Sequence, residues 1–318
     1  MTIADDPGVR TLIELARSED FGAGDVTTAL MEGADRPARF HLIAKAPCVL
    51  AGAAVLPAIL QAYDASLAVE WCSSQDLDPP PPEACSDKEE GDDPPDRPFP
   101  DGWSVREVPF QVATIRGQLA SILAAERVLL NFLQRLCGVA TLTRRFVEAV
   151  RGTGAAVYDT RKTTPGWRKL EKYAVRCGGG CNHRMGLYDA ILIKDNHLAG
   201  TPPQRIAAVV FDMLNRLDER GRRPALIEVE ADSLAQAEML FTVVGIDVVL
   251  LDNFSLDDLR RAVRLRDELG LKGKVALEAS GGITLETVRA VAETGVERIS
   301  IGALTHAAPA VDLSLERA

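Results

Sequence analysis

The sequence lacks a surplus of basic residues, and this deficit excludes one broad class of function. Its 318 residues contain 36 Lys and Arg against 46 Asp and Glu, which gives a net charge of −10. General nucleic-acid binders normally carry a basic surplus, so nucleic acid is not an expected partner. A local pocket for an anionic small molecule stays possible, because a few residues decide the charge of such a site.

Long apolar runs and the pattern of a signal peptide are also missing. No run approaches the ~20 apolar residues that a membrane helix requires. Residues 1–28 show no basic segment followed by an apolar one. The six cysteines are scattered, and Cys177, Cys181 and His183 lack the spacing and the fourth ligand of a zinc site. We therefore expect a cytoplasmic protein with reduced thiols and no membrane partner.

Most of the negative charge lies in one segment. Residues 76–101 contain ten Asp or Glu, only Lys88 and Arg97 as basic residues, and eight of the eighteen prolines, for a net charge of −8. This composition buries too little apolar surface to offset the entropy lost on ordering. We predict a disordered surface loop that is a tolerated insertion, with an acidic docking segment as the alternative. The rest of the chain carries about −2.

The first part of the chain has the pattern of an α+β domain. Helical spacing occurs at 9–17 and 54–62. Strand-like segments occur at 40–50, 67–71 and 105–117, and the first of them is broken at Pro47. Strands in series with little helix between them favour an antiparallel sheet. A long apolar helix is predicted over 118–137 and continues at 141–150. We place the domain boundary between residues 126 and 127.

The second part alternates short apolar runs with helical segments. The runs lie at 155–160, 189–195, 225–230, 247–252, 274–280 and 298–303, with helical patterns at 204–217, 256–269 and 285–294. This alternation predicts parallel strands with crossover helices. Polar groups follow nearly every run at its carboxyl end. Six polar strand ends fit the mouth of an α/β barrel better than the single switch point of an open sheet.

Basic side chains are concentrated at these strand ends. The candidates are Arg161, Lys162, His183, Arg184 and Lys194, with Arg127 on the long helix as a further one. Like charges repel unless an anion lies between them, and guanidinium groups bind carboxylates and phosphates in a bidentate manner. The set therefore predicts an anion site, although any single member could equally form a surface salt bridge.

Two carboxylates and two small-residue turns complete the predicted mouth. Glu230 and Asp252 could bind Mg²⁺, hold ribose hydroxyls or stabilise positive charge on a sugar carbon, and the alternative is salt bridges with Lys194 or Arg184. The segments 280–282 (Ser280, Gly281, Gly282) and 302–306 let backbone N–H groups approach an anion. A phosphate held after the last strands is a recurrent feature of barrels.

The segment DTRKTTPGWRKLEKYAVRCGGGCNHRMGLYDAILIKDNH at 159–197 resembles the signature of the quinolinate phosphoribosyltransferase family. Further segments fit the same family in the same order: EDFGAGDVTT at 19–28, AERVLLNFLQRLCGVATLTRRF at 125–146, EVEADSLAQA at 228–237, LLDNF at 250–254, EASGGI at 278–283 and IGALTH at 301–306. Cys137 and Trp167 depart from the pattern, and the Pro-rich segment is an addition to it.

The resemblance implies a fold and a reaction. The fold is an N-terminal α/β sandwich domain followed by an incomplete, TIM-like α/β barrel, in a homodimer or larger assembly. The reaction joins quinolinate and phosphoribosyl pyrophosphate, with Mg²⁺, to give nicotinate mononucleotide, pyrophosphate and CO₂ in NAD biosynthesis.

The resemblance also implies roles for individual residues. The dicarboxylate pocket comprises Arg127, Thr160, Arg161, Lys162, His183, Arg184 and Lys194. Arg127 reaches a partner subunit's site. Glu230 and Asp252 address the ribose and, weakly or indirectly, the metal. The phosphate is held by Ser280, Gly281, Gly282, Ile301, Gly302 and Ala303, with help from His306.

Two other functions fit the residues less well. A Schiff-base lyase would use Lys194 or Lys162 as its nucleophile, but the many arginines suit a dianion better than a neutral carbonyl. A metabolite-binding protein without activity would not need both the carboxylate pair and the complete basic set.

Overall fold

The computed structural model describes residues 2–80, 99–219, 224 and 226–318. The chain forms two compact units, which are not contiguous in sequence. The first unit contains residues 1–144, 162–180 and 304–318, and the second contains residues 145–161 and 181–303. The boundary predicted between residues 126 and 127 falls inside helix α3 (Leu119–Ala149), which runs without interruption through it.

The first unit contains a four-stranded antiparallel sheet in the order β12-β1-β5-β3. Its strands are β1 (Pro37–Ala44), β3 (Ala68–Trp71), β5 (Phe110–Gln118) and β12 (Leu313–Arg317). Buried and half-buried residues alternate along β1 from Phe40 onward, so one face of the strand packs on the core. The predicted break at Pro47 is confirmed, because β2 (Cys48–Val49) pairs separately with β4 (Ser104–Val105).

The helices of the first unit are α1 (Pro7–Phe21), α2 (Leu56–Tyr63), most of α3, and α4 (Arg168–Cys177), with the short α9 (Ala303–His306) at its boundary. The two helical stretches predicted over 118–150 form one helix. Gly138 lies between them inside the helix, and a Cβ there would lie 2.0 Å from the Pro309 carbonyl oxygen. This close approach of backbones requires glycine.

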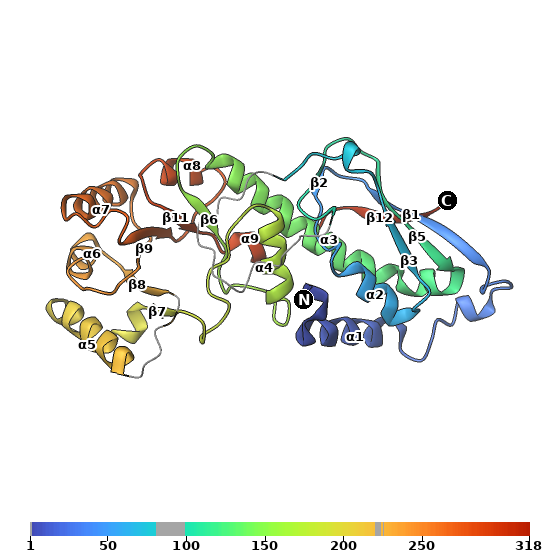
Figure 1. The fold of residues 1–318 in the computed structure, drawn as a ribbon, viewed down its shortest axis with the longest axis horizontal. Helices are drawn as coiled ribbons and strands as arrows, with labels where there is room; N and C mark the ends of the chain where they lie inside the picture. The colour runs from blue at the N-terminus through green and yellow to red at the C-terminus, as the bar shows by residue number, and fades with distance from the viewer. Residues whose placement is uncertain (1, 81–98, 220–223, 225) are drawn as a thin grey trace. The chain divides into compact units, whose positions relative to one another are not determined.

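The second unit contains a six-stranded, all-parallel sheet in the order β6-β11-β10-β9-β8-β7 (Figure 1). Its strands are β6 (Ala156–Tyr158), β7 (Ile191–Ile193), β8 (Ile227–Ala231), β9 (Val248–Asp252), β10 (Ala276–Ser280) and β11 (Arg298–Ser300). Each predicted run coincides with one of them, although β8 extends one residue beyond its run. No pairing joins the edge strands β6 and β7 within the described residues, so the barrel is incomplete, as expected.

Crossover helices lie along the outside of this arc of strands (Figure 1). They are α5 (Ile206–Glu219), α6 (Leu234–Leu240), α7 (Leu256–Glu268) and α8 (Val288–Ala292). Ser233 and Ser255 accept backbone N–H groups at the starts of α6 and α7, which fixes where each helix begins. The helices therefore leave the carboxyl ends of the strands to the connecting loops.

The segment predicted as a disordered loop, 76–101, is ordered at both of its ends. Leu77 is buried, and Asp101 is only 3% exposed. The Asp101 carboxylate accepts the Ala53 N–H at 2.9 Å, the Ala54 N–H at 3.1 Å and the Tyr173 hydroxyl. One of the ten acidic residues is thus a structural link inside the first unit. Residues 81–98 of the segment lie outside the described residues.

The structure also bears on the expected state of the thiols and on the expected lack of a membrane-spanning helix. Cys48, Cys72, Cys137 and Cys177 have free thiols, in agreement with the prediction of reduced thiols for these four residues. Within the described residues, no helix has both the length and the apolar character needed to cross a membrane.

Burial raises the pKa of Asp101 to about 6, although the Tyr173 hydroxyl and backbone N–H groups lower it. Between about pH 4 and pH 6, Asp101 therefore keeps its proton in the folded state but releases it in the unfolded state, where its pKa is near 3.8. The stabilisation that comes from this bound proton is complete below about pH 4 and is lost as the pH rises through about 6. We expect the free energy of unfolding of the wild type, relative to Asp101→Asn, to fall by about 2–3 kcal/mol between pH 4 and pH 7.

Urea unfolding at several pH values measures this difference. The exposed Asp20 provides the control, and Asp20→Asn should leave the pH dependence of the wild type unchanged. A difference between wild type and Asp101→Asn that stays constant with pH would contradict the assignment.

Candidate active site

The carboxyl ends of the six parallel strands carry most of the predicted site residues. Parallel strands end at the same edge of a sheet, where the loops of barrel enzymes hold the reacting groups. Ser280 at the end of β10 pairs directly with Asp252 at the end of β9. The predicted residues at this edge are Thr160, Arg161, Lys194, Glu230, Asp252, Ser280, Gly281, Gly282, Ile301, Gly302 and Ala303. His183 and Arg184 follow Cys181. The backbone of Cys181 forms an isolated parallel β-bridge with Tyr158 of β6.

Lys194 and Glu230 form an ion pair at this edge. Lys194 Nζ lies 3.0 Å from Glu230 Oε2, and the side chains are 45% and 7% exposed. Glu230 therefore has the salt-bridge partner that the sequence allowed as an alternative. A sugar hydroxyl that binds Glu230 would also lie beside the Lys194 ammonium, so the pair can serve a polar, negatively charged substrate.

Arg161 and Arg184 lie close enough to affect one another. The pKa of Arg184 is lowered by burial and by the neighbouring Arg161 guanidinium. The Arg184 side chain also donates to the Ala190 carbonyl at 3.2 Å, which holds it in place. Two guanidinium groups that affect one another favour a bound anion, and the predicted anion site stays a prediction.

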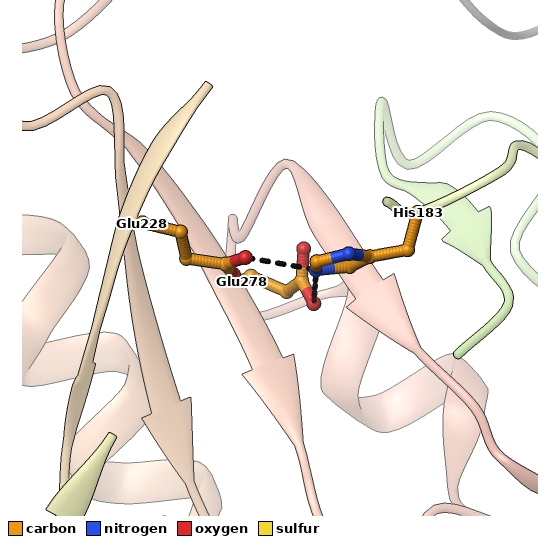
Figure 2. Close-up of side chains that lie close together, drawn as sticks. All are labelled: His183, Glu228 and Glu278. Atoms are coloured by element: carbon orange, nitrogen blue, oxygen red, sulfur yellow. Dashed lines mark ion pairs between the residues drawn. The ribbon is translucent and has the colours of Figure 1, made fainter. Parts of the chain in front are cut away.

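Four charged residues lie together in this unit and are here called the buried charge cluster: His183, which was predicted as a site residue, and Glu228, Glu278 and Arg298, which were not. Glu228 and Glu278 are fully buried, and Arg298 is 6% exposed. His183 Nε2 lies 2.8 Å from Glu228 and 3.6 Å from Glu278, and the three side chains point toward one another in Figure 2. Arg298 Nε donates to Glu278 at 2.7 Å, and its guanidinium lies over the Tyr158 ring.

The pKa shifts within the cluster show how its buried charges affect one another. Burial and the neighbouring Glu278 raise the pKa of Glu228. Burial lowers the pKa of His183, but the two glutamates outweigh it and raise that pKa. In Glu278, by contrast, His183 and Arg298 outweigh burial and lower the pKa. The charged groups of the cluster thus compensate one another inside the protein, as their burial demands.

Hydrogen bonds fix His183 and the chain around it. The Arg184 N–H donates to His183 Nδ1 at 2.7 Å, so the ring proton lies on Nε2, facing Glu228. The His183 N–H in turn donates to the buried Asp159 carboxylate at 2.9 Å. Both ring nitrogens are therefore engaged, and the backbone that leads to Arg184 is held from two sides.

By the separation of the ligand atoms alone, the buried charge cluster suits a metal ion better than the predicted pair Glu230 and Asp252 does. His183, Glu228 and Glu278 offer ligand atoms within 4.8 Å of one another, and no other such group of three occurs in the part of the chain that is described. Glu230 and Asp252 do not belong to it. However, the Arg298 guanidinium already neutralises Glu278, and a divalent ion would compete with it.

Three predicted site residues lie in the first unit. Arg127 on α3 and His306 at the end of α9 are exposed, and the Lys162 carbonyl accepts the Thr305 hydroxyl at 2.7 Å. An ion pair that the sequence reasoning missed, between Arg135 and the buried Glu171 at 2.6 Å, organises the segments around them.

The partners of this ion pair reach both segments. Glu171 accepts the Thr164 N–H at 3.0 Å and its hydroxyl at 2.8 Å, which fixes the chain that follows Lys162. Arg135 donates to the carbonyl of Ala308 at 2.9 Å and to that of Thr305, which fixes the chain around His306.

The missed residues leave a faint signal in the sequence. Glu228 is the second residue of the buried strand IEVEA, and Glu278 is the central residue of ALEAS. A charge within a buried strand is costly unless it is paired, so each glutamate predicts a partner. The sequence does not say which partner it is, because His183 and Arg298 lie on other elements.

Comparison with known proteins agrees with this architecture. The profile of the quinolinate phosphoribosyl transferase C-terminal domain matches residues 139–316. Quinolinate phosphoribosyltransferase [decarboxylating] 1b of Nicotiana tabacum is 35% identical, over 97% of this chain and 82% of its own. The probable nicotinate-nucleotide pyrophosphorylase [carboxylating] of Bacillus subtilis is 34% identical, over 94% and 89%.

A solved structure gives the same result. The nicotinate-nucleotide pyrophosphorylase from Francisella tularensis aligns with a TM-score of 0.81 at 33% identity, and the alignment covers 100% of this chain and 99% of that one. Sequence and fold thus agree over nearly the full length, and the chain belongs to the quinolinate phosphoribosyltransferase family.

Proposed function

We propose that the protein transfers a phosphoribosyl group from phosphoribosyl pyrophosphate to quinolinate and releases pyrophosphate and CO₂. The product is nicotinate mononucleotide, a precursor of NAD. Relatives that are 34–35% identical over at least 94% of the chain carry the names of this activity. The observation in the structure that carries the proposal is the gathering of basic side chains at the carboxyl ends of the strands, where Lys194 pairs with Glu230 and the Arg161 charge lowers the pKa of Arg184, because such groups suit a dicarboxylate.

In this reaction the basic residues position the substrate more than they transfer protons. Thr160, Arg161, Lys162, Arg184 and Lys194 bind the two carboxylates of quinolinate and orient the pyridine nitrogen toward C1 of the ribose. Both ring nitrogens of His183 are engaged, so His183 contributes by holding Arg184 in place.

The carboxylates act on the sugar. Departure of pyrophosphate leaves positive charge on C1, which Glu230 and Asp252 stabilise while they hold the ribose. The pyridine nitrogen then forms its bond to C1. The resulting pyridinium withdraws electrons, so the adjacent carboxylate leaves as CO₂ and the ring carbon takes up a proton.

The turns after the last strands bind the phosphate of the substrate. Gly281 and Gly282 have φ angles of 99° and 59°, which turn the chain sharply after Ser280. No neighbouring atom lies within 4 Å of a Cβ placed on Gly282, so its backbone is open to a ligand. The other members of this phosphate site are Ile301, Gly302, Ala303 and His306.

Mg²⁺ would be held here mainly by the pyrophosphate of the substrate. Glu230 is paired with Lys194, and Glu230 and Asp252 are not part of a three-ligand group among the described residues. Mg²⁺ commonly keeps several waters and binds through substrate phosphates with one or two carboxylates. Glu230 and Asp252 would therefore contact the ion weakly or through water, and its chemistry is neutralisation of the leaving group.

A homodimer or larger assembly completes the proposal. Arg127 is exposed on α3 and has no ion-pair partner among the described residues. An exposed arginine of this kind can bind an anion in the site of a neighbouring subunit.

An assay of quinolinate with phosphoribosyl pyrophosphate and Mg²⁺ tests the function directly, with nicotinic acid as the control substrate. Arg161→Ala and Lys194→Ala should each lower kcat/KM at least about 100-fold, because each removes a charge that orients the reactants. Arg260→Ala and Lys272→Ala are matched controls on the exposed surface of the second unit and should retain activity. Near-normal turnover in both site variants, or activity on nicotinic acid alone, would overturn the assignment.

Removal of Mg²⁺ should separate catalysis from stability. We expect a chelator to abolish turnover, because the pyrophosphate leaves poorly without a cation. The Tm of the protein without substrate should change by less than about 1 °C, since the ion has no preformed cage in the protein. A large loss of Tm on chelation would instead indicate a resident metal.

Mixing two inactive variants tests the shared site. Arg127→Ala and Arg161→Ala should each be inactive alone. In a mixed dimer, the site with Arg161 intact receives Arg127 from the other subunit, so co-refolding equal amounts should restore about a quarter of wild-type activity. No recovery, in mixtures that gel filtration and tagged pull-down show to contain mixed dimers, would place Arg127 outside the site.

A further inference from the structure

We propose that Asn253 is a positioning residue that fixes both the Asp252 carboxylate and the turn at Ser280, Gly281 and Gly282. The proposal rests on the proposed function, because it takes Asp252 as a ribose ligand and the turn as part of the phosphate site. Asn253 belongs to neither group, and it lies between them.

The backbone of Asn253 turns the chain at the end of β9. Its φ angle is 56°, and it is the only residue other than glycine with a positive φ among those the structure describes. Asparagine tolerates this left-handed conformation better than most residues do. Asn253 follows Asp252, which pairs with Ser280, and the Asn253 N–H donates to the Ser280 carbonyl at 2.9 Å. This hydrogen bond joins the ends of β9 and β10 where the turn at Gly281 and Gly282 begins.

The side chain of Asn253 contacts the two groups from one position. Its Nδ2 donates to Asp252 Oδ2 at 2.7 Å, which orients that carboxylate and leaves the other oxygen for a ligand. On the opposite side, a Cβ on Gly281 would lie 2.1 Å from Asn253 Oδ1 and 2.6 Å from its Cγ. The amide thus packs directly on Gly281, and residue 281 has no room for a side chain.

This contact matters because one substrate spans both groups. Ribose hydroxyls and the 5′-phosphate belong to the same molecule, so the carboxylate and the phosphate turn must keep a fixed separation. A single amide that contacts both of them sets this separation before the substrate binds. Preorganisation of this kind lowers the free-energy cost of binding.

Asn253→Asp tests the idea with nearly the same shape. The new carboxylate would face Asp252 Oδ2 without a donor and would repel it. We expect the KM for phosphoribosyl pyrophosphate to rise about tenfold, or about 1.4 kcal/mol, while the KM for quinolinate stays within about twofold. Asn253→Gly, which accepts the same φ, should raise the same KM by less, because it removes the donor without adding repulsion.

Asn215→Asp on the exposed face of α5 is the matched control, since it makes the same chemical change away from the site. It should leave both KM values unchanged. Equal kinetics for Asn253→Asp and Asn215→Asp in an active wild-type background would overturn the positioning role. Absence of activity in the wild type would refute the proposed function instead, so the two failures are distinguishable.

A double-mutant cycle shows whether Asn253 acts through Asp252. In the Asp252→Asn background the repulsion is absent, so Asn253→Asp should change kcat/KM for phosphoribosyl pyrophosphate by less than about twofold. Independent, additive losses would mean that Asn253 acts by another route and would overturn the proposal.

Discussion

Charge balance inside the buried charge cluster constrains the second unit more than any other interaction there. Glu228 and Glu278 lie on β8 and β10 with no exposure to solvent. An uncompensated charge at such a depth costs several kcal/mol, so both must be neutralised within the protein. Arg298 on β11 and His183 provide the compensation. These contacts hold β8, β10, β11 and the chain after Cys181 in one arrangement. Arg184 is held in place because its N–H donates to the ring of His183.

Local pattern predicts much of this fold, and long-range pairing explains what it misses. The six parallel strands and the long helix could be predicted because apolar runs and helical spacing are properties of neighbouring residues. Strand β12 and helix α4 were not predicted. Leu315 of β12 pairs with Leu42, and this contact joins residues far apart in sequence. Asp101 was placed in a disordered loop because its neighbours are acidic and Pro-rich, whereas its actual partners are Ala53, Ala54 and Tyr173.

The candidate site divides in the same way. The residue types and the strand ends made Arg161, Arg184, Lys194, Glu230 and Asp252 candidates, because polar groups after apolar runs are visible in the sequence. Their partners were not visible. The sequence left open whether Glu230 pairs with Lys194, and it gave no sign that Glu171 binds both Arg135 and Thr164. Such pairings depend on which side chains the fold brings together, and no local pattern encodes them.

The acidic net charge of the chain is compatible with an anion site because electrostatic interactions are short in range. Salt screens exposed charges beyond about 8 Å at physiological ionic strength, so charges remote from the mouth contribute little to its potential. Near the mouth, Glu228, Glu230 and Glu278 each have a basic partner, in His183, Lys194 and Arg298. The Arg161 guanidinium also lowers the pKa of Arg184, and an anion bound beside these two groups would offset their mutual repulsion.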